Sequence, residues 1–502
     1  MNRRQFLAAA AIGAVALAGG LLPQAFSPRV FGTAAEAVPR RPNFLFIFTD
    51  DQRWDAMGVV QREQGAQARF PWLRTPHMDR LAAEGVRFRN AFVVNSLCSP
   101  SRACFLTGRY NHLNGVANNR TPFPSDLPTH ATLLRQAGYT TGYFGKWHMG
   151  EEQGGPRPGF DVSASYLGQG IYFDCPFEVD GRAVATEGWV DDVATDYALR
   201  FIAENREKPF SMVVGFKSAH TPCTPPEKYK TLYAGETGRP PLNATARPSY
   251  PIEGSEIAVA PDYDTVPRFL NYFRTLAGAD DNLGRLLKAL DEHKLAEDTV
   301  VIYSSDNGYF LGEHGLRDKR SAYEESLRIP LLLRYPRLTR AGTQIDEIVL
   351  NIDLAPTLLD LARVPIPAEM QGRSWKQLLQ GEAAGWRRAF FYEYFFECNH
   401  PDTPTTTAVR TSHAKLINYP GHDDWTELYD LQRDPHEMQN LARDPAAKDL
   451  LARIEAEFER LAAAVQFSIP DYADRLDQEP PPNTRLGRAR AAQKKAQQNQ
   501  EP

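Results

Sequence analysis

The sequence predicts an α/β protein with a large doubly wound sheet, mixed but mostly parallel and flanked by helices, plus a small C-terminal antiparallel sheet with a helix. The first observation is a set of continuous apolar runs of strand length, as buried parallel strands have. These runs are residues 43–48, 140–145, 210–216, 299–304 and 329–334. The second observation is the set of helical patterns between them, at residues 78–84, 131–137, 193–205 and 269–293. Such alternation is typical of a sheet with helices on both faces.

The third observation is a change of texture near residue 381. Beyond it the chain has short aromatic or strand-like segments and then a strongly periodic helix. The strands are expected at 389–397, 407–419 and 426–430, and the helix at 446–465. This order indicates a small antiparallel sheet packed with one helix.

Length and composition indicate how the chain divides. A chain of 502 residues exceeds what one hydrophobic core normally supports. We expect a large α/β domain at 41–380 and a small α+β subdomain at 381–473. Residues 474–502 are rich in Pro, Arg, Lys and Gln, which favours a disordered tail. The proline-rich connection at 221–263 is too long for a simple loop and is expected to form walls of a binding site.

The N-terminus has the pattern of an export signal. A twin arginine lies in N-R-R-Q-F-L at 2–7, an apolar stretch rich in Ala and Gly follows at 8–22, and A-E-A at 35–37 offers a small-x-small cleavage site. A membrane span is the alternative, but the stretch is short, weakly hydrophobic and without a stop-transfer pattern. We predict a twin-arginine signal peptide at 1–37, no stable membrane span in the mature chain, and a periplasmic or extracellular location.

Charge and cysteine content exclude several classes of protein. The net charge of -5 gives no general cationic field, so we predict no nucleic-acid partner. The five cysteines are too few and too scattered for a disulfide scaffold. They are Cys98, Cys104, Cys175, Cys223 and Cys398. If Cys98 is modified, four remain that could pair, and the sequence leaves their pairing open.

Oxygen ligands follow two of the predicted strands. Asp50 and Asp51 come directly after the strand at 43–48, and Asp306 and Asn307 follow the strand at 299–304 in the same way. Functional groups collect at the carboxyl ends of strands in open α/β sheets. Three carboxylates and an amide oxygen suit calcium or magnesium better than zinc. The alternative is a pair of capped turns, which either pair alone would favour.

The segment C-S-P-S-R at 98–102, which continues as A-C-F-L-T-G-R, carries the most information. It resembles the maturation signature of type I sulfatases, which belong to the alkaline-phosphatase-like superfamily. The resemblance implies that a formylglycine-generating enzyme oxidises Cys98 to formylglycine before export, and that the aldehyde hydrate is the nucleophile. A sulfate ester surrounds its sulfur with negative oxygens, so a strong and well-placed nucleophile near positive charge is required. The plainer alternative is a buried cysteine in a loop before a helix.

The resemblance covers about residues 41–440 and implies a metal site and a charged pocket. The implied ligands of Ca²⁺, with Mg²⁺ also possible, are Asp50, Asp51, Asp306, Asn307 and the formylglycine made from Cys98. Arg102 is implied to steady the formylglycine and its charge.

The resemblance also assigns residues in three further motifs. Lys146 in G-K-W-H and Lys319 in G-L-R-D-K are implied to bind sulfate. His148 is implied to assist the formylglycine, and His220 in H-T-P to contact the ester near the leaving oxygen.

Each of these residues also has a plainer interpretation. A lone lysine is usually a solvated surface group, and a lone histidine can cap a strand end or be satisfied in the core. His112 and His314 lie near motifs as well, and we expect them at most to contact substrate or to support other residues.

The sequence therefore predicts a calcium-dependent sulfatase that hydrolyses sulfate monoesters of a sulfated carbohydrate or an aryl sulfate. Two alternatives stay open. One is a formylglycine-dependent phosphonate monoester or phosphodiester hydrolase, since the same charges suit phosphoryl transfer. The other, from another class, is a non-catalytic protein that binds sulfated glycans.

Overall fold

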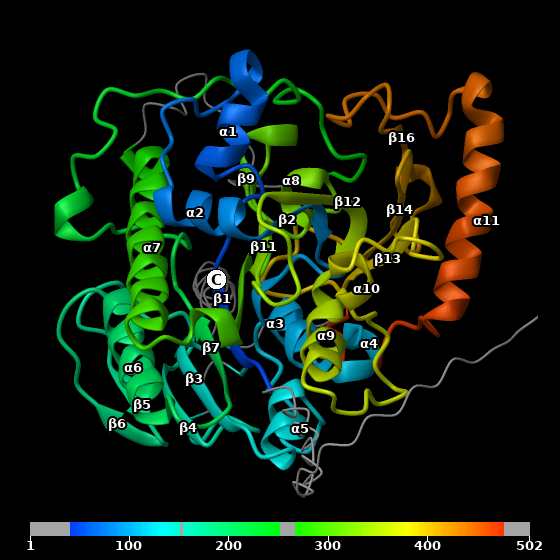
Figure 1. Cartoon of the computed structure of the whole chain (residues 1–502). Coiled ribbons are helices and arrows are strands. Elements are labelled where there is room, and N and C mark those ends of the chain that lie inside the picture. The colour runs from blue at the N-terminus through cyan, green and yellow to red at the C-terminus, as the bar shows by residue number, and fades with distance from the viewer. Residues whose placement is uncertain (1–40, 151–153, 252–266, 476–502) are drawn as a thin grey trace, which may run out of the picture. The chain divides into compact units, whose positions relative to one another are not determined.

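The computed structural model describes residues 41–150, 154–251 and 267–475 (Figure 1). The signal peptide expected at 1–37 and all but the first two residues of the expected tail at 474–502 lie outside these ranges. The described residues belong to the unit that begins at Arg41. None of the helices in the described part of the chain is both long and apolar enough to cross a bilayer.

A ten-stranded sheet forms the centre of this unit, in the order β12-β2-β11-β8-β1-β7-β3-β4-β5-β6. Its strands are β1 (Asn43–Thr49), β2 (Val86–Phe92), β3 (Thr140–Lys146), β4 (Val162–Tyr166), β5 (Phe177–Val179), β6 (Arg182–Val184), β7 (Phe210–Gly215), β8 (Thr299–Ser305), β11 (Leu331–Arg334) and β12 (Thr343–Leu350). β1 is parallel to β7 and β8, β3 is parallel to β7 and β4, and β2 is parallel to β12. β11 and β5 are antiparallel to their neighbours. The predicted fold class is confirmed.

One predicted strand runs in an unexpected direction. The apolar run at 329–334 predicts a buried parallel strand, but β11 is antiparallel to both neighbours. A parallel return needs a long crossover, usually a helix. Between β8 and β11 the chain forms β9 (Phe310–Leu311), a single 3-10 turn (Glu313–Gly315), β10 (Arg317–Asp318) and the short helix α8 (Glu324–Leu327), none of them long enough for a crossover. The chain therefore returns in the opposite direction.

Helices cover both faces of the sheet. One face carries α3 (Cys98–Thr107), α5 (His130–Gln136), α9 (Leu354–Leu361) and α10 (Lys376–Leu379). The other carries α1 (Gly58–Gln64), α2 (Pro76–Glu84), α6 (Val190–Asn205) and α7 (Pro267–Glu292), and α6 and α7 lie together at the left of Figure 1. Side chains alternate along β1: Phe44, Phe46 and Phe48 join the first core, while Leu45 and Ile47 join the second. β1 is thus buried on both faces and anchors both layers.

The C-terminal part is a four-stranded antiparallel sheet covered by one helix. Its strands are β13 (Ala389–Tyr394), β14 (Thr406–Thr411), β15 (Ala414–Asn418) and β16 (Glu427–Asp430), paired in that order. Helix α11 (Lys448–Ala464) packs on this sheet through Ile454 and its neighbours. The expected strand at 407–419 is divided into β14 and β15. Phe92 and Leu350, from two strands of the large sheet, share one core with the small sheet.

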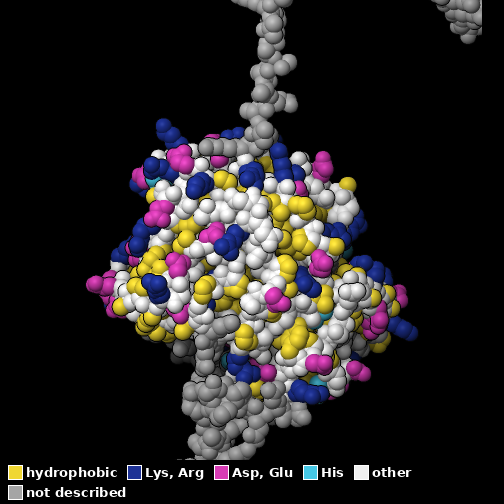
Figure 2. Space-filling model, turned by 90° about the horizontal axis from the view of Figure 1, so that it is seen from below, with side chains coloured by type: hydrophobic (Ala, Val, Ile, Leu, Met, Phe, Trp, Pro, Cys, Tyr) yellow, Lys and Arg dark blue, Asp and Glu magenta, His cyan; other side chains and the backbone are white. Residues whose placement is uncertain are grey.

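Surface charge does not gather by sign on the face drawn in Figure 2. Lys and Arg side chains alternate there with Asp and Glu side chains over the described residues. This mixture agrees with the small net charge of -5.

His112, in the short helix α4 (Asn111–Asn114), ties the small sheet to the rest of the unit. Its Nδ1 lies 2.6 Å from Glu393 Oε2, and its Nε2 lies 2.9 Å from the carbonyl oxygen of Val465. Both partners are acceptors, so the ring is held as an imidazolium. Burial opposes this charge, but the hydrogen bond and charge of Glu393 raise the pKa of His112 above its usual value. His112 therefore has a structural partner and lies outside the catalytic candidates.

The His112 bond should stabilise the fold in a pH-dependent way. A raised pKa means that the contribution is fully present below about pH 6.5 and is lost as the pH rises through the pKa in the folded protein. We expect His112→Ala to lower the free energy of unfolding by about 1–3 kcal/mol at pH 6 and by less at pH 9. Urea unfolding at both pH values measures this. The exposed His413→Ala is the control, and an equal loss at both pH values would contradict the charge assignment.

Candidate active site

The two predicted groups of oxygen ligands meet at the ends of β1 and β8. These strands are parallel neighbours in which Thr49 pairs with Ser305, so the residues that follow lie side by side. The amide of Asp51 donates to Asp306 Oδ1 at 3.2 Å, and Asn307 Nδ2 donates to Asp51 Oδ1 at 2.7 Å. All of these residues and Asp50 are buried. Register alone thus brings them together.

These residues fit a hard divalent cation. Asp50, Asp51 and Asp306 each present a carboxylate oxygen, and the three oxygens lie within 4.8 Å of one another. Asn307 Oδ1 is buried without a hydrogen-bond partner among the described residues. Burial raises the pKa of Asp51 to about 6, and burial with repulsion from Asp50 raises that of Asp306 to about 7. A bound cation would favour the ionised forms and use the free amide oxygen.

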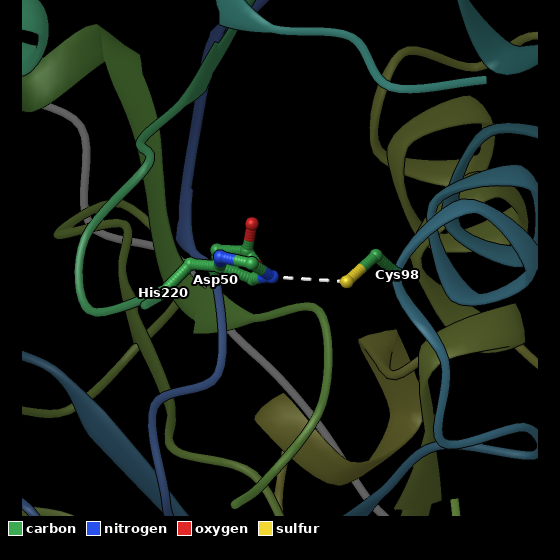
Figure 3. A group of neighbouring side chains, drawn as sticks. All are labelled: Asp50, Cys98 and His220. Carbon is green, nitrogen blue, oxygen red and sulfur yellow. Dashed lines mark hydrogen bonds between the residues drawn. The ribbon is translucent and has the colours of Figure 1, made fainter. Parts of the chain in front are cut away.

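Cys98 is the first residue of α3 and faces this carboxylate group. Figure 3 shows its sulfur directed toward Asp50 and the ring of His220. Sγ donates to Asp50 Oδ1 at 3.3 Å. Burial and the charge of Asp50 raise the pKa of the Cys98 thiol well above its usual value. An unmodified Cys98 is therefore held as a thiol, which is a poor nucleophile.

Three buried cations face the three carboxylates. Arg102, one turn after Cys98 on α3, donates from Nε to Asp306 Oδ2 at 2.9 Å. Lys146, at the end of β3, donates to Asp50 Oδ2. Lys319, which follows β10, donates to both Asp51 oxygens at 2.7 and 2.9 Å. Each charge brought into the interior has a partner of opposite sign, as buried charges require.

Two histidines complete the group, and both are held neutral. Burial and the charge of Lys146 keep the pKa of His148 well below its usual value. Burial is also the main cause of the lowered pKa of His220. His220 Nδ1 lies 2.7 Å from the Thr221 carbonyl oxygen, so Nδ1 carries the proton. The nitrogen that can exchange a proton with a ligand is therefore Nε2, which lies 3.9 Å from Asp51 Oδ2.

Two family models match the chain. The model described as Sulfatase matches residues 42–364, and the one described as N-sulphoglucosamine sulphohydrolase, C-terminal, matches residues 312–464. The chain belongs to the sulfatase family. It is therefore a sulfuric ester hydrolase, and this family in general works with a metal ion and a formylglycine.

Individual sulfatases agree with this assignment. An N-acetylglucosamine-6-O-sulfatase of Bacteroides thetaiotaomicron is 34% identical over 80% of this chain and 82% of its own length. A solved structure of a protein in complex with its substrate, D-glucosamine-2-N,6-O-disulfate, has a TM-score of 0.77 and 31% identity over 87% of this chain and all of that chain. A phosphonate monoester hydrolase of Agrobacterium radiobacter has a TM-score of 0.70 at 23% identity over 85% of this chain and 96% of its own, which shows a shared fold alone.

The sulfatase pocket also contains two residues that the sequence reasoning missed. Lys146 donates to Gln169 Oε1, and Lys217 Nζ donates to the Gln169 carbonyl oxygen at 2.7 Å. Burial and the neighbouring Lys146 lower the pKa of Lys217 to about 8. Lys217 follows β7 and could have been found by the strand-end rule. Gln169 lies in the connection between β4 and β5, and no motif marks it.

His314 lies outside this pocket. Its ring stacks on Tyr323 at 3.8 Å between centroids, and it forms a buried group with Glu325 and Glu437 that has the composition of a metal site. Part of this group is already bonded to neighbouring side chains, although His314 Nδ1 and Glu325 Oε2 are buried without a hydrogen-bond partner among the described residues. Asn243 Nδ2 donates to His314 Nε2 and to Glu325 Oε1, both at 3.0 Å. Lys415 pairs with Glu437 at 2.6 Å. His314 therefore belongs to a structural network.

The five cysteines all lie within the described ranges, and none forms a disulfide. All are buried. The sequence left the pairing of four cysteines open, and in this structure no two of them are joined.

Proposed function

We propose that this sulfatase is a calcium- and formylglycine-dependent enzyme that removes sulfate from a sulfated amino sugar. The observation that carries the proposal is the position of Cys98, which faces Asp50 at 3.3 Å and is surrounded by buried Arg102, Lys146 and Lys319. The N-acetylglucosamine-6-O-sulfatase relative and the structure with a glucosamine disulfate support the substrate class.

The chemistry of the proposed groups can be stated briefly. A formylglycine hydrate at position 98 would supply one hydroxyl as the nucleophile toward sulfur and a second hydroxyl whose deprotonation would release sulfate. Asp50, Asp51, Asp306 and Asn307 would hold a calcium ion, which would supply positive charge to the sulfate.

The remaining steps belong to this chain's own side chains. Lys146 and Lys319 bind the sulfate oxygens, and Arg102 balances charge beside the attacking group. His220 gives a proton to the leaving oxygen from Nε2. Because Nδ1 keeps its own proton on the Thr221 carbonyl oxygen, this step requires the imidazolium, which the negative charge of a bound ester would favour. His148 takes the proton of the second hydroxyl, because its lowered pKa keeps it neutral and ready to accept.

Export is part of the same proposal. A twin-arginine signal at 1–37 would carry a folded chain, so a formylglycine-generating enzyme would meet Cys98 before export to the periplasm or beyond. We also propose the domain division that the sequence predicts, a catalytic α/β domain at 41–380 and a small α+β subdomain at 381–473.

Cys98 should be present as an aldehyde in protein from the native host. We expect the tryptic fragment 90–102 to escape thiol alkylation and to react with a hydrazide. Cys98→Ala should abolish turnover, and Cys98→Ser should stop as a stable sulfate ester, while Cys104→Ala keeps activity. Peptide mass spectrometry and a sulfate-release assay measure these effects. Fully alkylated Cys98 in active, metal-loaded protein would overturn the aldehyde mechanism. Fully alkylated Cys98 in protein that binds a sulfated glycan without turnover would favour the binding-protein alternative.

The metal can be tested by stability as well as by activity. Calcium at a hundredfold excess over its dissociation constant should stabilise the chelator-treated protein by about 2.7 kcal/mol, seen as a higher melting temperature. Asn307→Leu should weaken calcium binding at least about tenfold, or ~1.4 kcal/mol. The control is Asn205→Leu, at the half-buried last residue of α6. Greater stabilisation by zinc than by calcium or magnesium would contradict the assignment of a hard cation.

The residues that flank Lys319 support a sugar as the substrate. Asp318 and Arg320 form an ion pair, and Glu397 accepts from Arg320 Nε at 2.8 Å. Burial opposes ionisation of Asp318, but Arg320 and Lys319 lower its pKa below the usual range. Its side chain is 25% exposed, whereas that of Lys319 is 3% exposed. An ionised carboxylate at the edge of the sulfate pocket suits hydroxyl groups of a sugar.

Asp318→Asn should therefore affect a sugar more than a simple aryl ester. Loss of a hydrogen bond to a charged group costs about 1.5–3 kcal/mol, so KM for N-acetylglucosamine 6-sulfate should rise about 10- to 100-fold. KM for 4-nitrophenyl sulfate should change little, and the exposed Asp346→Asn is the control. An equal effect on both substrates would refute the sugar contact. Rates on an aryl phosphodiester in the same assay test the phosphoryl alternative.

A further inference from the structure

The loop at 167–171 between β4 and β5 brings an unassigned residue into the pocket. Gly168 and Gly170 flank Gln169 and have φ of +54° and +60°, a conformation that favours glycine. A Cβ at Gly170 would lie 2.5 Å from the Tyr166 ring, so the loop passes close over the end of β4. The sequence G-Q-G thus fixes where the glutamine side chain is presented.

Gln169 separates buried charges from solvent. Lys146 and Asp50 are each 0% exposed, whereas Gln169 is half-buried. Lys146 donates to Gln169 Oε1, and Lys217 donates to its carbonyl oxygen at 2.7 Å. One neutral, half-buried residue therefore contacts two ammonium groups.

The amide orientation leaves one polar group unused. Lysine can only donate, so the oxygen of the Gln169 amide must face Lys146. Gln169 Nε2 donates to none of the residues that the structure describes. Lys217 has no carboxylate partner in the same part of the chain, and its Nζ lies 5.1 Å from the centre of the Tyr172 ring. Of the two ammonium groups that contact Gln169, Lys146 is paired with Asp50, and Lys217 is bonded to no carboxylate among the described residues.

We propose that Gln169 is a substrate-binding residue whose Oε1 orients Lys146 and whose Nε2 donates to a sulfate oxygen of the ester. This inference rests on the proposed function, because Lys146 is taken to bind the sulfate. A neutral amide serves both purposes, since its oxygen accepts from the lysine while its nitrogen donates to the anion. A carboxylate in its place would keep the first contact and repel the sulfate.

Glutamate and alanine variants separate these two contacts. Gln169→Ala removes both, and we expect KM for the sulfate ester and the inhibition constant of inorganic sulfate each to rise about 10-fold or more. Gln169→Glu keeps the acceptor for Lys146 but should raise both constants at least as much. kcat should fall less than KM rises. The matched control is Gln344→Ala, since Gln344 on β12 donates to Glu63 of α1, away from the pocket. A Glu variant equal to the wild type would overturn the sulfate contact.

The loop itself provides a second variant. Gly170→Ala should displace Gln169, because the added Cβ meets the Tyr166 ring, and should raise the same two constants. Gly65→Ala is the control, since Gly65 has a similar φ of +51° with no atom within 4 Å of a Cβ. Unchanged constants in the Gly170 variant would contradict the inference.

Calorimetry of inorganic sulfate binding distinguishes this inference from the proposed function. Wild-type protein that binds sulfate without hydrolysing the ester would refute the proposed function. In that case weaker sulfate binding by the Gln169 variants would still support the contact, and unchanged binding would overturn it. Protein that neither binds sulfate nor hydrolyses the ester would overturn both. Active wild-type enzyme with unaffected Gln169 variants would overturn the inference alone.

Discussion

Three buried carboxylates at the ends of two adjacent strands are the constraint on which this structure depends. Asp50, Asp51 and Asp306 are taken out of water by the register of β1 and β8. An isolated buried charge costs several kcal/mol, so compensation must come from elsewhere. Arg102, Lys146 and Lys319 supply it from α3, from the end of β3 and from the segment after β10. The pocket therefore forms only when these distant segments are assembled around the sheet. The same ion pairs that make the site also compensate the charges that the fold buries.

The central strands could be predicted because they are apolar on both faces. Residues 43–48 and 299–304 appear in the structure as β1 and β8 with ends within one residue of those expected. β2 was missed because two arginines, Arg87 and Arg89, interrupt its apolar pattern. In the structure Arg87 is paired with Glu63, and the more exposed Arg89 is paired with Asp346. An apolar run says that a strand is buried but carries no information on its direction. The direction of β11 was decided by the lack of a crossover helix.

The residues of the site could be predicted where they lie in a sequence motif or directly after a predicted strand. The predicted residues of the pocket come from six separate parts of the chain and lie together. His112 and His314 are near motifs in sequence but lie outside the pocket. His112 is bonded to Glu393, and His314 stacks on Tyr323. Gln169 was not predictable, because its place is set by two glycines and by lysines that become neighbours only after folding. Sequence proximity and spatial proximity thus diverge most in the loops.

Counting donors indicates why a pocket with balanced charges can still take an anion. A lysine has three N–H donors. Lys146 uses one on Asp50 and one on Gln169, and Lys319 uses two on Asp51. One donor of each lysine is left for a ligand, and Gln169 Nε2 adds another. The carboxylates therefore fix the positions of the lysines without consuming all of their hydrogen bonds. Donors held in place before the substrate arrives need no reorganisation when charge develops on the sulfate, which is the condition for electrostatic stabilisation of a transition state.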